Sequence, residues 1–332
     1  MATYTKLKSG WRCQIRKSGI SKSKNFKTKA AAQMWALQIE TEIENGTFNN
    51  VPDIPFSFVI ERYLKEVTPT KKGSRSEKSR LNAFKEMEIG KISLVDLCED
   101  DFNNFIEKRL ETVQINSVLR ELNILSNVIT FAIKWKYINK NPIKLIERPK
   151  KGPDRTRRYT DEEIERLVYV SKYDFNHLPK TSRSRTGAAM LFAIETAMRA
   201  GEICNATWEN INFEKRTLFI PDSKNSYSRT VPLSSLAMKI INHLWLVKSD
   251  YDNRVFRMSS DTLDKNFRTL KELAALDDVN LRFHDTRREA LSRLAKKVEV
   301  MTLAKISGHR DIKILLNTYY APNIEEVVDL LD

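Results

Sequence analysis

The stretch AIETAMRAGEICNATW, residues 193–208, decides how the C-terminal half of the chain is interpreted. It ends an apolar helical run and continues into a polar segment in which Arg199 and Glu202 lie three residues apart. Side chains at that spacing are neighbours on a helix, and exposed pairs of this kind are usually structural. The pair alone predicts a helix, and any further role depends on the residues that the fold brings beside it.

Helices dominate the prediction around this stretch, with one small β element. Thr160 and Glu163 match the T-x-x-E capping box, which predicts the start of a helix. The runs RTLFIP and SRTVPLS are strand-like, and they flank the polar turn DSKNSY, which contains Lys224. Residues 159–332 are therefore predicted to form a mostly helical domain with a small β-hairpin or sheet.

Further polar side chains follow in two patterns nearer the C-terminus. In HDTRREALSRLA, His284 and Arg287 lie on one helical face, where such pairs are most often hydrogen-bonded neighbours. In GHRDIKILLNTYYAPN, His309 follows a glycine in a predicted turn, and Tyr319 stands next to Tyr320. Adjacent helical residues point about 100° apart, so one packed face cannot accept both rings equally well. One of the two tyrosines is therefore a candidate for a role other than packing.

The composition excludes several kinds of protein. The 57 Lys and Arg residues outnumber 43 Asp and Glu, and the formal net charge of +14 favours a polyanionic partner, either nucleic acid or an acidic membrane surface. No apolar run reaches the roughly 18 to 20 residues of a membrane helix, and the N-terminus lacks the apolar centre of a signal peptide. We therefore expect a soluble, cytoplasmic protein. The three cysteines are few and far apart, and no glycine-rich phosphate motif occurs, so we expect no disulfide framework, no metal and no nucleotide cofactor.

The first fifty residues predict a basic strand-and-helix module. Residues 1–30 carry nine Lys or Arg and no acid, and GWRCQIRKSGISKSKNF is typical of short strands joined by a Gly-Ser turn. A helix is expected to follow in TKAAAQMWALQIETEIENG. Residues 1–50 are interpreted as a small DNA-binding module, with a disordered basic tail as the alternative. The predicted packed face of the helix and its glycine stop are Ala31, Met34, Trp35, Leu37, Ile39 and Gly46.

A Pro-containing joint, NNVPDIPFS, separates this module from a second helical region. Apolar residues recur at intervals of three and four in FSFVIERYLKEV, DDFNNFIEKRL and INSVLRELNILSNVITFAIKWK. Residues 54–147 are therefore predicted to be a compact helical domain, and ERPKKGPDRTRRY predicts a basic linker at 148–158 that touches a phosphate backbone. Four lysines of the helical domain face either phosphates or solvent: Lys71, Lys72, Lys78 and Lys85.

The polar residues of the C-terminal domain, taken in order, resemble the active-site series of the tyrosine recombinases, the phage-integrase family. Four local patterns carry the resemblance: T-A-M-R-A-G-E, a lysine before R-T-V-P-L, H-D-T-R-R, and S-G-H ahead of a tyrosine. The resemblance implies a mainly α fold with small β-sheets in three parts: an arm-type DNA-binding module, a helical core-binding (SAM-like) domain and a catalytic domain. The series is Arg199, Lys224, His284, Arg287, His309 and Tyr319.

The resemblance also implies a site-specific DNA recombinase, an integrase, that cleaves and rejoins DNA through a 3′-phosphotyrosine and integrates or excises a phage or other mobile element. Physical chemistry supports this, because a covalent phosphotyrosine keeps the bond energy without ATP or a metal. Arg199 and Arg287 are suited to hydrogen-bond the nonbridging phosphate oxygens, where negative charge gathers in the transition state. A lysine whose pKa is lowered by neighbouring cations can protonate the leaving 5′-oxygen, and we assign this role to Lys224.

The remaining roles come from the resemblance. His284 is implied to be the general base toward the tyrosine hydroxyl, and His309 is implied to donate a hydrogen bond to the phosphate. Glu202 is expected to brace the arginines rather than touch DNA, because packed cations repel one another without an acid among them.

The choice of nucleophile stays open between Tyr319 and Tyr320. The family's usual spacing from the G-H histidine falls on Thr318, so this chain departs from the pattern by one inserted residue. Counted from the C-terminal side, Y-Y-A-P resembles the family's ending and favours Tyr319, with Tyr320 as the alternative. At most one ring can reach the phosphorus in line, and the other is expected to pack.

The resemblance implies double-stranded DNA as the partner, bound at core-type and arm-type sites by a homotetramer associated with the nucleoid. An excision factor and a host DNA-bending protein are candidate further partners.

The final segment NIEEVVDLL predicts an amphipathic helix that packs on its own domain or on a neighbouring protomer. Two other functions stay open: a non-catalytic DNA-binding protein on a recombinase scaffold, and a type IB topoisomerase-like relaxing enzyme. The basic N-terminal module favours the recombinase.

Overall fold

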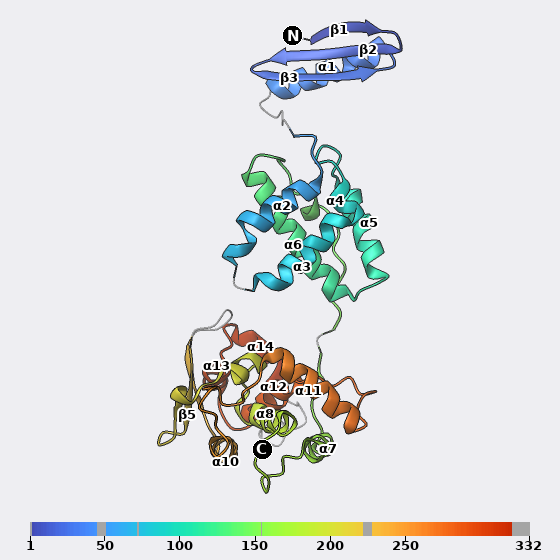
Figure 1. The fold of residues 1–332 in the computed structure, drawn as a ribbon. Helices are drawn as coiled ribbons and strands as arrows, with labels where there is room; N and C mark the ends of the chain where they lie inside the picture. The colour runs from blue at the N-terminus through green and yellow to red at the C-terminus, as the bar shows by residue number, and fades with distance from the viewer. Residues whose placement is uncertain (1, 45–50, 72, 154, 222–227, 321–332) are drawn as a thin grey trace, which may run out of the picture. The chain divides into compact units, whose positions relative to one another are not determined.

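The computed structural model describes residues 2–44, 51–71, 73–153, 155–221 and 228–320. The chain divides into two compact units, Met1–Pro153 and Asp154–Asp332, which run from blue to green and from green to red in Figure 1. Both units are mostly helical, and each contains a three-stranded antiparallel sheet. The predicted fold class, mainly α with small sheets, is confirmed. Among the described residues, no helix is long and apolar enough to cross a membrane.

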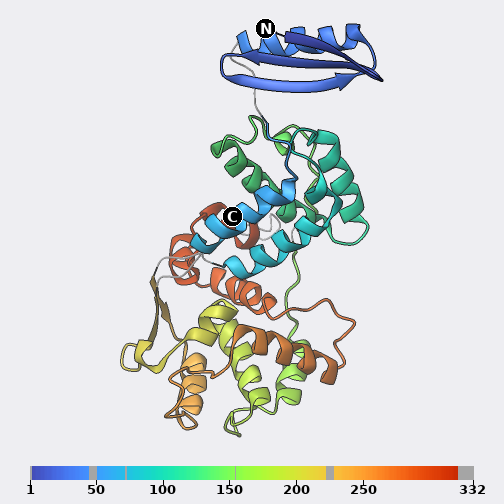
Figure 2. The same cartoon turned by 45° about the horizontal axis from the view of Figure 1, so that its top comes forward.

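The N-terminal module is a three-stranded meander with one helix packed on it. Figure 2 shows α1 along one face of the sheet, in strand order β1-β2-β3. Its core is formed by Cys13, Ile15, Ala32 and Ala36, all of them buried. Because residues 2–44 form this packed structure, the alternative of a disordered basic tail is wrong for them. The elements are β1 (Ala2–Leu7), β2 (Gly10–Lys17), β3 (Ile20–Phe26) and α1 (Lys29–Glu44).

The predicted packed face of α1 is partly wrong. Met34 and Leu37 are 75% and 69% exposed, and Ala31 is exposed as well. The helix instead packs through Ala32 and Ala36, which lie four residues apart on one stripe and have side chains small enough for a close approach to the sheet. A pattern weighted by large apolar residues overlooks such a stripe. Of the other predicted positions, Trp35 and Ile39 are partly buried in this core, and Gly46 lies outside the described residues.

The helical domain of the first unit has its own core, separate from that of the N-terminal module. Large aromatic side chains dominate it, including Phe56, Phe84 and Phe102. Helix α3 was not predicted, because its polar sequence shows only two buried apolar positions, Leu81 and Phe84. The elements are α2 (Phe56–Glu66), the 3-10 helix η1 (Thr68–Thr70), α3 (Ser74–Glu86), α4 (Glu88–Lys91), α5 (Glu99–Leu110), α6 (Ile115–Lys134) and the 3-10 helix η2 (Pro142–Lys144).

Two of the four lysines considered as phosphate contacts are engaged within this domain. Lys71 donates a hydrogen bond to the Tyr63 hydroxyl at 2.5 Å and pairs with Glu77 at 2.7 Å. Lys85 pairs with a glutamate of α2. A lysine held by a carboxylate must leave it to reach a phosphate, so the structure favours internal roles for these two. Of the others, Lys78 is exposed and Lys72 lies outside the described residues.

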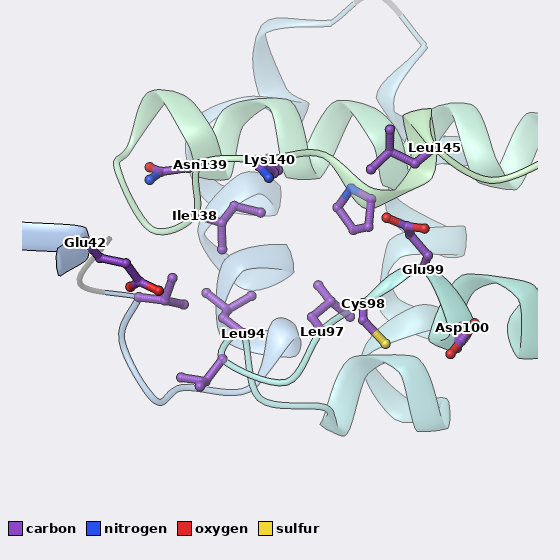
Figure 3. Close-up of a pocket in the computed structure, with 13 residues that line it drawn as sticks. Glu42, Leu94, Leu97, Cys98, Glu99, Asp100, Ile138, Asn139, Lys140 and Leu145 are labelled. Carbon is purple, nitrogen blue, oxygen red and sulfur yellow. The ribbon is translucent and has the colours of Figure 1, made fainter. Parts of the chain in front are cut away.

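A hollow of about 720 Å³ lies in the first unit (Figure 3). Leu94, Leu97 and Ile138 give it an apolar wall, and Glu99 and Asp100 also line it. None of the predicted catalytic residues lines this hollow, because all of them belong to the second unit.

The second unit is built around α8, which packs against α7, α10, α11 and α12. A second, smaller core under α12, α13 and α14 contains Ala197, Ala290, Leu303 and Leu315. The elements are α7 (Asp161–Ser171), α8 (Ser182–Thr196), α9 (Ala200–Asn205), the 3-10 helix η3 (Trp208–Asn210), β4 (Ile211–Asn212), β5 (Thr217–Ile220), β6 (Arg229–Pro232), α10 (Ser235–Trp245), α11 (Ser260–Leu273), α12 (Asp285–Ala295), α13 (Val300–Ser307) and α14 (Ile312–Tyr319).

Two local predictions for this unit are confirmed. The Thr160 hydroxyl accepts the N–H of Glu163 at 3.2 Å, and the Glu163 carboxylate accepts the N–H of Thr160 at 2.9 Å, which is the predicted capping box. The two strand-like runs form β5 and β6, paired antiparallel.

The described part of the basic linker is held against α12. Arg155 pairs with Asp285 through two contacts of 2.8 and 2.5 Å, and Arg158 pairs with Glu289 at 3.0 Å. Both carboxylates are nearly buried. These arginines therefore fasten the linker to the helix that carries Arg287, and a phosphate contact from them remains a prediction.

Candidate active site

Arg199 is positioned by the break between two helices. Helix α8 ends at Thr196, Ala197 takes a left-handed conformation with φ of 52°, and Arg199 becomes the N-cap residue of α9. Glu202, in the first turn of α9, accepts the backbone N–H of Arg199 at 2.8 Å and its Nη1 at 2.9 Å. The pair is therefore a cap as well as an ion pair, and it fixes both the backbone and the guanidinium of Arg199.

Arg229, on β6, completes this cluster, and the sequence analysis missed it. Its Nη1 and Nη2 donate to the two oxygens of Glu202 at 2.9 and 2.7 Å, and its Nε donates to the carbonyl of Ile306 at 2.8 Å. The Arg229 and Glu202 side chains are each 7% exposed. Arg229 is the first residue of the pattern R-T-V-P-L, but that pattern was interpreted only as a sign of the lysine that precedes it.

Arg287 joins the end of α8 to the end of α13. It is 4% exposed, and its Nη1 and Nη2 donate to the carbonyl oxygens of Ala197 and Ser307, the second at 2.7 Å. Burial, together with the neighbouring charge of Arg199, lowers the pKa of Arg287 to about 9, so the guanidinium is still protonated at pH 7. These contacts use two of its five N–H donors.

The charge balance of the cluster favours an anion. Burial raises the pKa of Glu202, but hydrogen bonds from Arg229 and Arg199 outweigh that effect and hold the pKa at about 2. At neutral pH one carboxylate therefore stands among Arg199, Arg229 and Arg287. The excess positive charge, on guanidiniums fixed by backbone and carboxylate acceptors, suits the nonbridging oxygens of a phosphodiester.

Glu202→Gln is expected to lower the free energy of unfolding at pH 7 by about 3 kcal/mol, because an amide leaves the buried guanidinium of Arg229 and the partly exposed one of Arg199 without their counter-charge. The pKa of Glu202 is lowered from 4.5 to about 2, so its stabilisation is fully present above about pH 5 and is lost as the pH falls through about 2. Urea unfolding of both proteins from pH 7 to pH 3 measures this. The difference between them should stay constant down to about pH 5 and then shrink, and a constant difference down to pH 3 would contradict the assigned ionisation.

Two histidines lie beside the arginines. His284 is the N-cap residue of α12 and is exposed, yet partial loss of water contact and the charge of Arg287 lower its pKa. His309 follows Gly308, which takes the left-handed conformation (φ 70°), where an added Cβ would lie only 3.1 Å from Nη1 of Arg229. Burial, then Arg287 and Arg199, lower the pKa of His309 to about 4. Both imidazoles are therefore neutral at pH 7 in the absence of DNA.

The structure separates the two adjacent tyrosines. Both are half-buried, but the Tyr320 hydroxyl donates to the carbonyl of Val298, at the turn between α12 and α13. Burial raises the pKa of Tyr319, while the charges of Arg288, Arg287 and Arg158 act in the opposite direction. The pKa of Tyr320 is raised by burial and by Glu299. Arginine charges therefore act on the Tyr319 hydroxyl, whereas the Tyr320 hydroxyl is held by a backbone carbonyl.

The site brings together most of the predicted series. The residues come from four helix ends and one helix. Arg199 is the N-cap of α9, Arg287 lies on α12 and His309 follows α13, while His284 is the N-cap of α12 and Tyr319 ends α14. Lys224 and the predicted C-terminal helix of residues 324–331 lie outside the described residues. The arrangement offers fixed cations for a phosphate, neutral imidazoles and a phenol.

Comparison with known proteins gives concordant results. The model of the phage integrase family matches residues 157–326. A putative integrase/recombinase of Haemophilus influenzae is 52% identical over 98% of this chain and 89% of its own length. A shufflon-specific DNA recombinase of Escherichia coli is 32% identical over 78% of this chain and 67% of its own length. A lambda integrase tetramer bound to a Holliday junction is similar in structure, with a TM-score of 0.64 and 16% identity over 92% of each chain.

Proposed function

The chain belongs to the phage integrase family and is a tyrosine site-specific DNA recombinase, and we propose that it cleaves DNA with Tyr319 as the nucleophile. The observation that carries this assignment is the difference between the two rings: the charges of Arg288 and Arg287 act on the Tyr319 hydroxyl, whereas the Tyr320 hydroxyl donates to the carbonyl of Val298. The two alternative functions, a non-catalytic scaffold and a relaxing enzyme, are not favoured by these relatives.

In the proposed cleavage step, the Tyr319 hydroxyl oxygen attacks the phosphorus and the bond to the 5′-oxygen breaks. Arg199 and Arg287 hydrogen-bond to the nonbridging oxygens as their charge grows. His284, whose lowered pKa leaves it neutral at pH 7, accepts the tyrosine proton, and Lys224 gives a proton to the departing 5′-oxygen. The DNA is then held through its 3′-phosphate on Tyr319.

Strand exchange follows by the reverse chemistry. A 5′-hydroxyl from the second DNA site attacks the phosphotyrosine and gives its proton to Lys224, while the tyrosine oxygen leaves and regains its proton from His284. The energy of the original phosphodiester is kept in the covalent link, so the cycle needs no ATP.

We further propose that the N-terminal module reads an arm-type DNA site with the open face of its sheet. Along β2, Cys13 and Ile15 point toward α1, so Arg12, Gln14 and Arg16 point to the other face. The residues directly opposite them on β3 are Asn25, Ser23 and Ser21. A β surface fits a major groove, where arginine recognises guanine and asparagine or glutamine recognises adenine.

Arg12→Ala is expected to weaken binding to an arm-type duplex by about 10-fold through loss of a base contact. Lys24→Ala removes the same charge from the opposite face, because Lys24 pairs with Cys13, and should weaken binding only about 2-fold. Fluorescence anisotropy with the DNA that flanks the crossover site measures both affinities. Equal losses would show that the module contributes charge alone and would contradict a base-reading face.

We propose a homotetramer on two DNA sites as the active assembly, supported by the likeness to the lambda integrase tetramer on a Holliday junction. An excision factor and a host DNA-bending protein are proposed as further partners, because a module for a second class of DNA site requires bent DNA to bring both sites together.

The direct test of the proposed function uses a nicked suicide duplex that carries the crossover site of the element. A covalent protein–DNA adduct on a denaturing gel, formed without nucleotide, is expected, and its absence on a verified site would favour a DNA-binding scaffold.

A further inference from the structure

Ser307 touches two residues of the active site at once. It is the last residue of α13, and its relative exposure is 0%. Its carbonyl oxygen accepts Nη2 of Arg287 at 2.7 Å, and its Oγ lies 2.7 Å from Nδ1 of His309. The left-handed Gly308 reverses the chain between Ser307 and His309 and allows this short contact.

The protons of this contact can be assigned by counting donors. The Ser307 Oγ also lies 2.6 Å from the carbonyl oxygen of Leu303, which can only accept. A serine hydroxyl has one hydrogen, and if that hydrogen were given to His309, two bare oxygens would face each other at 2.6 Å. The hydroxyl therefore donates to Leu303, and Nδ1 of His309 must carry a hydrogen that it donates to Ser307.

We propose that Ser307 is a positioning residue that holds His309 in the Nδ1–H form, so that Nε2 is unprotonated in the free protein and takes up one proton when the scissile phosphate binds. This inference rests on the proposed function of the site and deepens it. A neutral Nε2 and a phosphate oxygen are both acceptors and repel each other. His309 therefore becomes an imidazolium, with a proton taken from the solvent, and donates to the phosphate as a cation.

The burial of His309 and the cations around it are consistent with a ring that is neutral in the free protein and gains a proton when phosphate binds. The pKa of His309 is about 4 in the free protein because burial, Arg287 and Arg199 disfavour its charged form. A phosphodiester brings a negative charge that offsets those cations and raises the pKa of His309. The charged and titratable groups that act on the ring from the neighbouring elements are Arg287 of α12, His284 at the N-cap of α12, Arg199 before α9, and Arg229 of β6.

The tautomer can be measured without DNA. The chain has four histidines, so ¹⁵N-histidine spectra that correlate ring nitrogens with ring protons contain few signals, and His309→Gln identifies the one from His309. At pH 7 we expect a neutral ring protonated on Nδ1 in the wild type and in Ser307→Thr, which keeps the hydroxyl. Ser307→Ala should lose this preference. A wild-type His309 protonated on Nε2 would overturn the proposal, whether or not the variants fold, and would leave the recombinase assignment intact.

A cleavage assay separates positioning from simple structural support. Ser307→Ala is expected to slow adduct formation by about 10-fold near pH 6.5, where wild-type His309 acts as the cation. The ratio of wild-type to Ser307→Ala rates should fall towards one as the pH rises to about 9, because the variant can donate from a neutral Nε2–H and no longer needs the extra proton. Ser307→Thr should follow the wild-type profile. A loss of equal size at every pH would indicate only weakened packing and would overturn the positioning role.

Discussion

Tyr319→Phe is expected to form no detectable covalent adduct on the nicked suicide duplex, because it lacks the hydroxyl oxygen that is proposed to attack the phosphorus. Tyr320→Phe is expected to cleave within about 10-fold of the wild type, since it loses one hydrogen bond, to the carbonyl of Val298. The two variants differ from the wild type by one oxygen atom each and are one residue apart, so each is the control for the other.

The comparison of these two variants also shows how the chain accommodates the inserted residue before Tyr319. Helix α14 ends at Tyr319, and Tyr320 is its C-cap residue with φ of −115° and ψ of 8°. The two rings therefore leave the backbone in different directions. An adduct that survives in Tyr319→Phe and disappears in Tyr320→Phe would show that α14 rearranges on DNA, and it would contradict the assignment of the nucleophile.

Arg287→Ala is expected to slow cleavage by about 10³-fold, because a buried guanidinium that stabilises charge only in the transition state is removed. Arg287→Lys keeps a charge but lacks the planar fork that reaches two acceptors, so it should recover only part of the rate. Single-turnover cleavage of the suicide duplex measures both. DNA affinity, measured in parallel, should change far less than the rate.

The matched control for this prediction is Arg293→Ala on the same helix. Arg293 is 41% exposed and pairs with Glu289 and Asp161, so its loss should change cleavage by no more than about 3-fold. Because Arg287 also ties Ala197 to Ser307, circular dichroism must show that Arg287→Ala is folded. A folded Arg287→Ala that cleaves at the wild-type rate would remove this residue from the mechanism.

Local rules predicted much of the fold. The capping box at Thr160 and the two strands around the polar turn follow from short-range chemistry, and the sequence reveals both. The prediction of the packed face of α1 was partly wrong. The small side chains of Ala32 and Ala36 contact the sheet, whereas a periodicity weighted by side-chain size favours Met34 and Leu37.

The sequence predicted which residue types form the candidate site, but it did not predict the hydrogen bonds and ion pairs that connect them. Glu202 was expected to brace arginines, but its bond to Arg229 joins residues 27 positions apart, which no local pattern reveals. The acceptors of Arg287 are backbone carbonyls, which any residue type supplies. Likewise, the direction of the Tyr319 and Tyr320 rings depends on what α12 and α13 place beside them. The catalytic roles of all these residues stay predictions.

Locating the covalent link on the chain decides whether Tyr319 is the nucleophile. Wild-type protein is trapped on the suicide duplex, the complex is digested with protease and nuclease, and the remaining nucleotide is mapped by tandem mass spectrometry within the tryptic peptide that follows Lys313. A nucleotide phosphate is expected on Tyr319 and none on Tyr320. A phosphate on Tyr320, or on any other residue, would contradict the assignment of the nucleophile.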